Sequence, residues 1–412
     1  MGMRRVVITG MGAISPFGQG VDLLNESLEC GKSGIVISPE LAAMDGANSH
    51  VAGIVADIDP MEIPRKYRRS MSMMSIYSVL ACQEALNMAQ LPPECLVDES
   101  MGVVIGSTID SINTFEDFFK DYLVRKNMEQ MRSTIFFKLM NHSCAFNVSQ
   151  VMGINGRVIA PSAACSTGCQ AAGIGYEMIA FGKQDYMLCG GSDEFHPLTT
   201  FTFDLINAAS KGFNSFPSRT PRPFDRDRDG IVCSEGCGIL LLESLESAEE
   251  RGADILAEIA GFASTANPLN IANPSAESMV ACMRKVLSDG EINPLDIDYV
   301  NAHATATVQG DIEESKAIYE VFGENVPVSS LKGHLGHTMA ASGSLELIAT
   351  IEMMRKNKII PTLNLENIDE LCDSINLFQD VEERPVKYAL KNNFALGGVN
   401  SSLVLRSYEN DK

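Results

Sequence analysis

Short hydrophobic runs alternate with helical segments along this chain. Residues 4–10 (RRVVITG), 100–107 (SMGVVIGS) and 185–191 (DYMLCGG) have the length and composition of buried strands, whereas residues 70–89 have the length of a helix. This alternation predicts layers of α-helix and β-sheet packed on one another. No run approaches the roughly 18 apolar residues of a membrane-spanning helix, so we expect no membrane as a partner.

Two pairs of segments are weakly alike, which suggests a duplication. Residues 156–183 and 326–358 both run from a strand through small residues into a helix with a basic end, and 236–244 is similar to 397–407. A helical pattern ends near Gly252, and a strand pattern restarts at Ile255. We therefore predict two α/β halves, 1–254 and 255–412, that pack closely because no low-complexity linker separates them.

Cys165 lies where a strand (GRVIAP) is predicted to lead into a helix of very small residues (STGCQAAG). Several glycines in a helix are costly unless close packing requires them. The N-terminal dipole of a helix that begins at Cys165 would favour a thiolate by about 1 kcal/mol. Cysteine is also a common buried residue. The setting alone therefore leaves both a nucleophilic and a structural Cys165 open.

Histidines in two later segments favour the nucleophile. VNAHATAT contains His303, and SSLKGHLGHTMAASG contains Lys332, His334 and His337. Both segments consist mainly of small residues, which let a substrate approach the backbone. We predict catalytic roles for His303 and His337, and structural roles for the other four histidines, His50, His142, His196 and His334.

Seven ordered segments resemble the β-ketoacyl-acyl carrier protein synthases of the type II elongating kind, within the thiolase superfamily. They are the three segments described above, around Cys165, His303 and His337, together with RRVVITGMGAISPFG, YMLCGGSDE, RPFDRDRDGIVCSEGCGILLLESLESAEERGA and KNNFALGGVNSSLVL. The resemblance implies a thiolase-like fold of duplicated α/β halves in a layered α-β-α-β-α sandwich, with the active site at the seam between the halves. The implied activity is decarboxylative Claisen condensation of a Cys-bound acyl chain with malonyl-acyl carrier protein.

The resemblance also implies roles for individual residues. Cys165 would accept the acyl chain, His303 and His337 would bind the malonyl thioester and promote its decarboxylation, and Lys332 would organise both histidines with Glu314 as its carboxylate partner and Asp311 in support. The backbone N–H groups of Cys165 and Leu396 would form the oxyanion hole. The pantetheine and acyl-chain residues would be Thr305, Thr307, Ile109, Phe203 and Phe394.

The last of these segments departs from the family pattern. The usual GFGGTN reads ALGGVN, with Ala395 in place of glycine and Leu396 in place of the gating phenylalanine. A backbone donor does not depend on its side chain, so we expect the oxyanion hole to be kept. The β-carbon of Ala395 would restrict the loop. The acyl gate is therefore expected to be specialised.

Charge narrows the choice of partners. The formal net charge is −21, which opposes binding to nucleic acid or to an anionic membrane. A basic cluster (Arg65, Lys66, Arg68 and Arg69) stands out against it. Relatives contact acidic carrier protein in this region, so we expect acyl carrier protein to dock here. Asn207 stands where many relatives have a second docking arginine. We expect this second contact with the carrier protein to be weakened unless Lys211 substitutes for the arginine.

The cysteines and loops imply no cofactor. Eleven cysteines without zinc-ligand spacing favour reduced thiols, and hence a cytoplasmic protein. GMGAISPFG lacks the spacing of a dinucleotide-binding loop, and DRDRDG at 225–230 lacks the glutamate of a calcium loop, so we expect a structural turn there. We expect no metal and no redox cofactor.

Three functions remain open. The first is a condensing enzyme in fatty acid or type II polyketide or polyene synthesis, as a homodimer or as a heterodimer with a ketosynthase-like chain-length subunit. The second is a non-catalytic chain-length subunit, which would typically have lost the nucleophile that Cys165 provides. The third is a coenzyme-A-dependent thiolase-like acyltransferase, which would need a second catalytic cysteine late in the chain, whereas the last cysteine, Cys372, lies outside any Gly-rich loop.

Overall fold

The structure is a computed structural model that describes residues 3–56, 58–129, 131–268 and 273–408. Within these residues, twelve strands form one continuous hydrogen-bonded sheet in the order β13-β11-β10-β15-β16-β9-β1-β8-β7-β5-β6, with β2 paired to β1. The strands before residue 250 are β1 (Val6–Ser15), β2 (Gly18–Gln19), β5 (Met101–Gly106), β6 (Val158–Ile159), β7 (Tyr186–Asp193) and β8 (Gly236–Ser244). Those after it are β9 (Ala257–Ala266), β10 (Tyr299–Asn301), β11 (Pro327–Ser329), β13 (Asn376–Leu377), β15 (Tyr388–Phe394) and β16 (Val399–Arg406).

The same strand order occurs twice in this sheet. Starting from β1, the pairings β1-β8 and β8-β7 are antiparallel, and β7-β5 and β5-β6 are parallel. Starting from β9, the pairings β9-β16 and β16-β15 are antiparallel, and β15-β10 and β10-β11 are parallel. A short antiparallel pairing of β1 with β9 joins the two units. This repeat confirms the predicted duplication of the fold.

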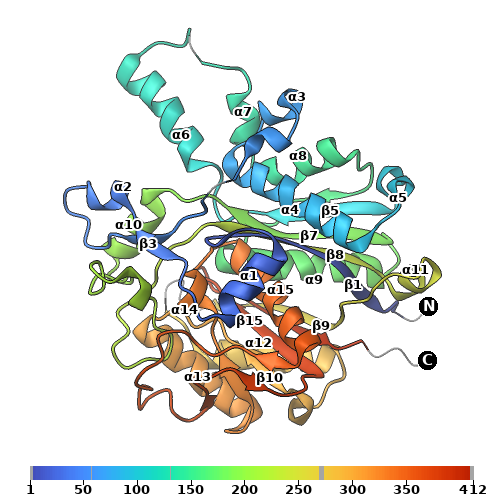
Figure 1. The fold of residues 1–412 in the computed structure, drawn as a ribbon, viewed down its shortest axis with the longest axis vertical. Coiled ribbons are helices and arrows are strands. Elements are labelled where there is room, and N and C mark those ends of the chain that lie inside the picture. Colours follow the sequence, from blue (N-terminus) through green and yellow to red (C-terminus); the bar gives the residue numbers. More distant parts are fainter. Residues whose placement is uncertain (1–2, 57, 130, 269–272, 409–412) are drawn as a thin grey trace.

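Helices form the remaining layers (Figure 1). α9 (Thr167–Ala180) and α15 (Ala341–Lys356) pack on each other, and each contacts strands of both units. α4 (Met73–Ala89) and α8 (Ser143–Met152) cover the outer face of the first unit. α12 (Ala276–Asp289) and α13 (Val308–Phe322) pack against each other beside the second unit, where α12 contacts β9 and β16. The three largest hydrophobic clusters of the described residues follow these layers. The predicted α-β-α-β-α sandwich is confirmed.

Small residues let the two central helices approach closely. A β-carbon at Gly168 would lie 2.6 Å from the carbonyl oxygen of Ala340, and one at Gly343 would lie 2.4 Å from the backbone nitrogen of Cys169. Real β-carbons do not approach other atoms so closely. The glycines of the Cys165 segment are therefore explained by packing, as the sequence indicated.

Shorter elements complete the chain. They are α1 (Val21–Glu29), β3 (Ile35–Ile37), α2 (Pro39–Ala42), β4 (Val51–Gly53), α3 (Arg65–Arg68), α5 (Pro93–Val97), α6 (Ile112–Phe119), a π-helix (Lys120–Arg125), α7 (Ile135–Lys138), α10 (Pro197–Leu205), α11 (Leu245–Glu250), α14 (Lys332–Leu335), β12 (Lys358–Ile359) and β14 (Glu382–Glu383). The segment from α6 to α7 projects from the body as an arm (Figure 1). No helix of the described ranges combines the length and hydrophobicity required to cross a membrane.

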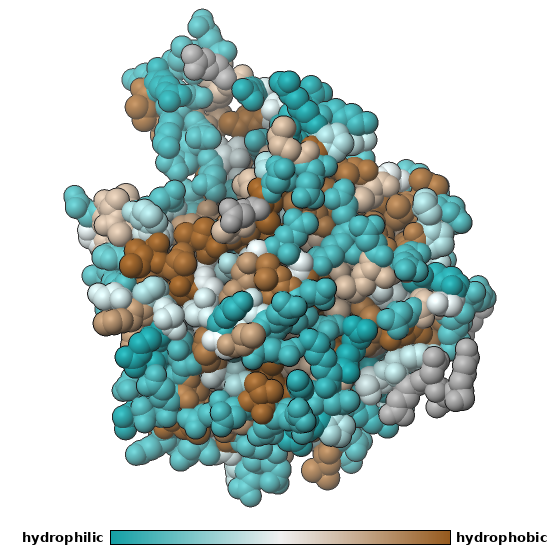
Figure 2. Space-filling model, in the orientation of Figure 1, coloured by the Kyte–Doolittle hydropathy of each residue, from teal (hydrophilic) through white to brown (hydrophobic). Residues whose placement is uncertain are grey.

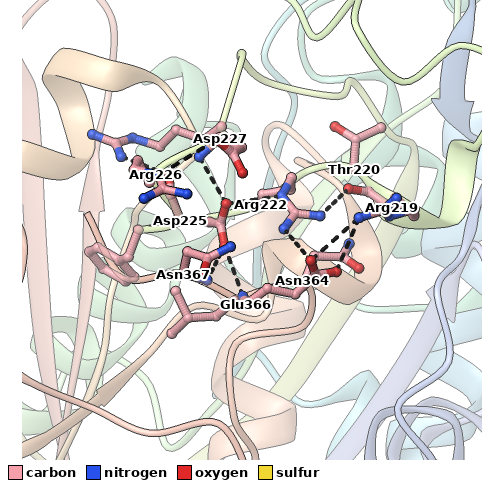
Figure 3. A network of polar contacts seen from close by, with 12 residues as sticks. Arg219, Thr220, Arg222, Asp225, Arg226, Asp227, Asn364, Glu366 and Asn367 are labelled. Carbon is pink, nitrogen blue, oxygen red and sulfur yellow. Dashed lines mark hydrogen bonds and ion pairs between the residues drawn. The ribbon is translucent and has the colours of Figure 1, made fainter.

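The acidic segment at 225–230 forms a structural turn, as expected (Figure 3). The fully buried carboxylate of Asp225 accepts hydrogen bonds from Arg222 Nε at 3.2 Å and from the backbone N–H groups of Asp227, Glu366 and Asn367 at 2.8 to 2.9 Å. The network ties residues 219–228 to residues 364–367. Since residues 229–231 line the pocket described below, the network supports one of its walls.

Candidate active site

Cys165 lies in a tight turn between β6 and α9. A 3-10 turn covers Ala164–Ser166, and α9 begins at Thr167, so the prediction that the helix begins at Cys165 was wrong. Ala164 has a left-handed backbone (φ 47°), which is unusual for a residue with a side chain. The turn before α9 places the thiol on the side of the second unit.

The second unit holds this turn in place. Asn393 Nδ2 donates to the carbonyl oxygen of Cys165 at 3.1 Å, and the hydroxyl of Ser342 donates to the same oxygen at 3.4 Å. The hydroxyl of Ser166 lies 2.9 Å from the carbonyl oxygens of both Asn393 and Val399. Cys165 therefore lies at the seam between the units, with 5% of its surface exposed.

His303 and His337 face Cys165 from the second unit. The Cys165 sulfur and one ring nitrogen of each histidine lie within 4.8 Å of one another. The two imidazole rings are 5.3 Å apart and nearly perpendicular, at 82°. His303 follows β10 and His337 follows β11, so both occupy loops at the carboxyl ends of adjacent parallel strands, where ligands of α/β sheets bind.

Backbone contacts fix both histidine loops. The carboxylate of Glu314, in α13, accepts the backbone N–H groups of His303 and Ala304 at 2.8 and 2.7 Å. His337 exchanges backbone hydrogen bonds with residues 232 and 234 of the first unit. The imidazoles are thus positioned by rigid elements of both units.

The ring of His337 is oriented as a hydrogen-bond donor. The backbone N–H of Met339 donates to His337 Nδ1 at 3.2 Å, so the neutral ring carries its proton on Nε2. Among the described residues, His337 Nε2 has no hydrogen-bond partner, and neither has His303 Nδ1. Buried polar nitrogens without partners are rare in folded proteins and indicate a place for a ligand.

Both imidazoles are neutral at physiological pH. Burial lowers the pKa of His303 and of His337 well below the usual value, and the positive charge of Lys332 lowers both further. Each ring therefore presents a neutral N–H group to the pocket. The same charge opposes a metal cation at these Cys and His atoms.

Cys165 is a thiol at neutral pH, which corrects the thiolate expectation. Burial raises its pKa to about 11, although Lys332 and the backbone N–H groups of Leu396 and Cys165 act in the opposite direction. The helix-dipole argument neglected desolvation, which disfavours the charged form and is the larger effect here. The two N–H groups that act on the sulfur are those predicted for the oxyanion hole.

Lys332 pairs with Glu346 and not with Glu314, which corrects the predicted contact. Lys332 Nζ lies 2.7 Å from one carboxylate oxygen of Glu346, and Lys391 Nζ lies 2.6 Å from the other. Lys332, Lys391 and Glu346 are each at most 1% exposed. Sequence reasoning missed Glu346 and Lys391, although a charged residue inside the apolar runs SLELIATI and YALKNNF is a signal, because such residues are almost never buried unpaired.

Asp311 does not contact Lys332, which the resemblance implied that it would support, and instead holds another segment. Its buried carboxylate accepts the backbone N–H of Phe224 at 2.9 Å and lies 3.6 Å from Arg228 Nε. It therefore holds the segment shown in Figure 3 against α13. Burial raises the pKa of Asp311 to about 7, against the effect of Arg228.

Leu396 lies in the turn between β15 and β16. The backbone N–H of Ala395 donates to the carbonyl oxygen of Val399 at 2.9 Å, which closes the turn. Gly397 and Gly398, with φ of 88° and 76°, adopt the left-handed conformations of the turn, whereas Ala395 does not have a positive φ. The β-carbon of Ala395 therefore causes no backbone strain here.

A pocket of about 550 Å³ opens onto Cys165. It is lined by the two histidines and by Leu396, and by four of the predicted substrate residues, Phe203, Thr305, Thr307 and Phe394. The hydroxyls of Thr305 and Thr307 lie 3.2 Å apart. The fifth, Ile109, does not line this pocket and is 50% exposed. The backbone N–H of the preceding residue, Thr108, donates to the buried carboxylate of Asp193 at the end of β7.

The predicted docking cluster lies on and beside α3, which packs on α8. Among the described residues, Arg65, Lys66, Arg68 and Arg69 form no ion pair with a carboxylate. At the pocket, Lys211 Nζ donates to Asn207 Oδ1 at 3.4 Å, so a positive charge does stand beside Asn207.

His334 is a structural residue, as predicted. Its ring nitrogens lie 3.1 and 3.2 Å from the carbonyl oxygens of Lys32 and Pro361. His50, His142 and His196 likewise contact neighbouring groups outside the pocket. Only His303 and His337 of the six histidines line the described pocket.

Comparisons with known proteins identify the family. Residues 3–248 match the family described as beta-ketoacyl synthase, N-terminal domain, and residues 256–366 match its C-terminal domain. The chain is similar to 3-oxoacyl-[acyl-carrier-protein] synthase 1 of Haemophilus influenzae, with 33% identity over 98% of this chain and 100% of that protein. The chain therefore belongs to the β-ketoacyl synthase family, and it is an acyltransferase of the condensing, carbon–carbon bond-forming kind.

Solved structures agree with this assignment. A beta-ketoacyl synthase from Burkholderia phymatum has 39% identity and a TM-score of 0.94, covering 99% of this chain and all of that one. A type II polyketide ketosynthase in complex with its acyl-carrier protein (32% identity) and the ishigamide ketosynthase/chain length factor (28%) both have TM-scores of 0.91, each with 99% of this chain and 100% of the other covered.

Proposed function

We propose that this chain elongates acyl chains by condensing an acyl group held on Cys165 with a malonyl group on acyl carrier protein, in fatty acid or type II polyketide or polyene synthesis. One observation carries the proposal. A buried thiol and two neutral imidazoles, with ligand atoms within 4.8 Å of one another, lie at one pocket of about 550 Å³. This arrangement suits a reaction that needs a nucleophile and two hydrogen-bond donors for an oxyanion.

In the first half-reaction the Cys165 sulfur attacks the thioester carbonyl of the acyl carrier protein. Because the resting group is a thiol, its proton must leave during attack, and the departing sulfur of the carrier is the group that takes it up. The backbone N–H groups of Cys165 and Leu396 would stabilise the tetrahedral oxyanion. The carbon–sulfur bond to the carrier then breaks, and its thiol leaves with a proton.

In the second half-reaction a malonyl thioester enters the same pocket. His303 and His337 would donate N–H groups to its carbonyl oxygen. The bond to the terminal carboxylate breaks, carbon dioxide leaves, and the electron pair forms an enolate whose oxygen charge both donors stabilise. The enolate carbon attacks the thioester of Cys165, the carbon–sulfur bond breaks, and the β-ketoacyl chain leaves on the carrier. Cys165 is released as a thiolate and takes a proton from solvent, which restores the resting thiol.

Acyl carrier protein is the partner that this mechanism requires. Four positive charges at residues 65–69 have no carboxylate partner in the described part of the chain, and on a chain with a net charge of −21 they suit an acidic protein. A structural relative is known in complex with its acyl-carrier protein, which supports this partner. We place the docking site on the α3 cluster and the protein in the cytoplasm.

We also propose that the chain works as a dimer, with a second copy or with a ketosynthase-like chain-length subunit. The arm from α6 to α7 exposes large apolar side chains, including Val124 (78%), Met128 (61%) and Phe136 (62%). The short strand β6, at the end of the strand order, exposes 40% of Val158. Apolar residues also gather over β3 and α10 on the face shown in Figure 2. Native mass spectrometry of the chain alone and with its partner would distinguish the two dimers.

Intact mass spectrometry tests the proposed function. Wild-type protein incubated with an acyl-acyl carrier protein should gain the mass of one acyl group, and Cys165→Ala should gain none. Cys169→Ala, which removes another fully buried thiol in α9, is the matched control and should load normally. His303→Ala and His337→Ala should lose malonyl decarboxylation more than loading. Acylation that persists in Cys165→Ala would refute the assignment.

A further inference from the structure

Lys391 is a buried charge that the proposed mechanism does not use. It lies in the middle of β15, between Asn301 of β10 and Leu403 of β16, in a strand that is buried on both faces. Its side chain is completely inaccessible to solvent. Moving an ammonium group into such a site costs several kcal/mol, and a buried ion pair commonly fails to recover that cost as stability. A functional reason for the lysine is therefore worth seeking.

The contacts of Lys391 connect it to the two imidazoles through Glu346 and Lys332. Its Nζ forms an ion pair with one oxygen of Glu346 at 2.6 Å and donates a hydrogen bond to the backbone carbonyl oxygen of Asn392. Lys332 Nζ donates to the other oxygen of Glu346 at 2.7 Å. Glu346 is thus clamped between two ammonium groups that come from different elements, β15 and α14. Without Lys391, one oxygen of a fully buried carboxylate would lose its ionic partner, and the carboxylate would be free to turn away from Lys332.

The charges behind the imidazoles balance only when Lys391 is included. Two lysines, Lys332 and Lys391, face two carboxylates, Glu346 and Glu314. Burial raises the pKa of Glu314 and lowers the pKa of Lys391, and the opposite charges of this group act against both shifts. Glu314 holds the backbone of His303, and Glu346 holds Lys332. Removal of Lys391 leaves this buried wall with one excess negative charge next to both rings.

We propose that Lys391 is a positioning residue for the condensing reaction, because it holds the Glu346 carboxylate through which Lys332 is kept beside the two imidazoles. The inference rests on the proposed function. Lys391 also acts on the two rings through its positive charge. The charged and titratable groups that face the imidazoles are Cys165, Lys332, Lys391 and Glu314, and those that face Lys391 are Glu346, Lys332, Glu314 and Cys169.

Lys391→Met tests this role, because methionine fills a similar volume without charge. Malonyl decarboxylation at pH 7 should fall about tenfold or more, the rate equivalent of one lost charge-assisted hydrogen bond. The excess negative charge should also move the titration of the His303 and His337 rings to higher pH, as measured by NMR of ¹³C-labelled histidine. Loss of packing alone would lower the rate without moving these titrations.

Three further variants complete the test. Lys391→Arg keeps the charge and should leave the two ring titrations near those of the wild type. Lys387→Met makes the same substitution at an exposed position just before β15 and should change neither rate nor titration. If Lys391→Met does not fold, Lys391→Gln removes the charge and should give the same titration shift.

Two outcomes would overturn the proposal. One is that the titrations and the decarboxylation rate of the neutral variant match those of the wild type. The other is that Lys391→Arg shifts the titrations as much as the neutral variant does. Failure of the wild type to load an acyl group or to decarboxylate malonyl would refute the proposed function instead, and the ring titrations would still decide the role of Lys391.

Discussion

At the residue level, the protonation of Cys165 distinguishes this site from one built on a resting thiolate. With a pKa raised to about 11, only about one thiol in ten thousand is ionised at pH 7. The alkylation rate of Cys165 by iodoacetamide should therefore still rise with pH above 9 and reach half of its maximum only near pH 11. Peptide mass spectrometry after timed alkylation would follow this residue alone. A rate that is already constant between pH 7 and 8 would contradict the buried-thiol description.

Leu396 supports a second prediction at this level. It replaces the phenylalanine expected from the family pattern, lines the pocket and is 41% exposed. Leu396→Phe should lower the loading of long acyl chains relative to short ones, because side-chain volume grows while the backbone donor stays. Competition between a long and a short acyl-carrier-protein substrate measures the ratio. The control is Leu295→Phe, at a side chain that is 86% exposed and outside the pocket. An unchanged ratio in Leu396→Phe would show that the residue is not a selectivity gate.

At the level of elements, buried polar contacts between distant segments hold the pocket walls. Asp225 accepts four hydrogen bonds, two from residues 222 and 227 of its own segment and two from residues 366 and 367, which join residues 219–228 to residues 364–367 (Figure 3). Asp225→Ala leaves the buried Arg222 with only the half-exposed Glu366, at 3.4 Å, as a carboxylate partner, and it leaves three backbone N–H groups without their acceptor, so we expect the free energy of unfolding to fall by about 3–5 kcal/mol. Urea unfolding followed by far-UV circular dichroism measures this in a chain without tryptophan.

The adjacent arginine provides the control for this element. Arg226 forms an ion pair with Asp227 at 3.7 Å, with both side chains more than half exposed. Such surface pairs contribute at most about 1 kcal/mol, so Arg226→Ala should barely move the unfolding midpoint. If the two variants were equally stable, the buried network would not support the wall as described.

At the level of the whole molecule, charge distribution should guide the encounter with acyl carrier protein. Reversal of charge at Arg65 and Arg68 should raise KM for the carrier-protein substrate, with little change in the turnover of small thioester mimics. A double variant at Lys183 and Lys285, which are exposed elsewhere, makes the same change in net charge. Equal effects of both double variants would mean that net charge, and not the α3 cluster, controls docking.

The sequence by itself determined the layered α/β class, the duplication and the candidate chemistry. These follow from local patterns, since strand and helix periodicity and the small residues around Cys165, His303 and His337 are all visible along the chain. The structure brings these three residues close to one another, and four of the five predicted substrate residues line the same pocket. Their catalytic roles stay predictions until the variants are measured.

Only the tertiary structure decided the charges and partners of the site. Lys332, Glu346 and Lys391 come from three elements, and their spacing in the sequence does not indicate that both lysines pair with the carboxylate of Glu346. The protonation of Cys165 was likewise beyond the sequence, because desolvation depends on how completely the two units enclose the thiol, whereas the helix dipole can be anticipated from local structure alone. The exposure of Ile109 was decided in the same way, by the position of its segment relative to the pocket.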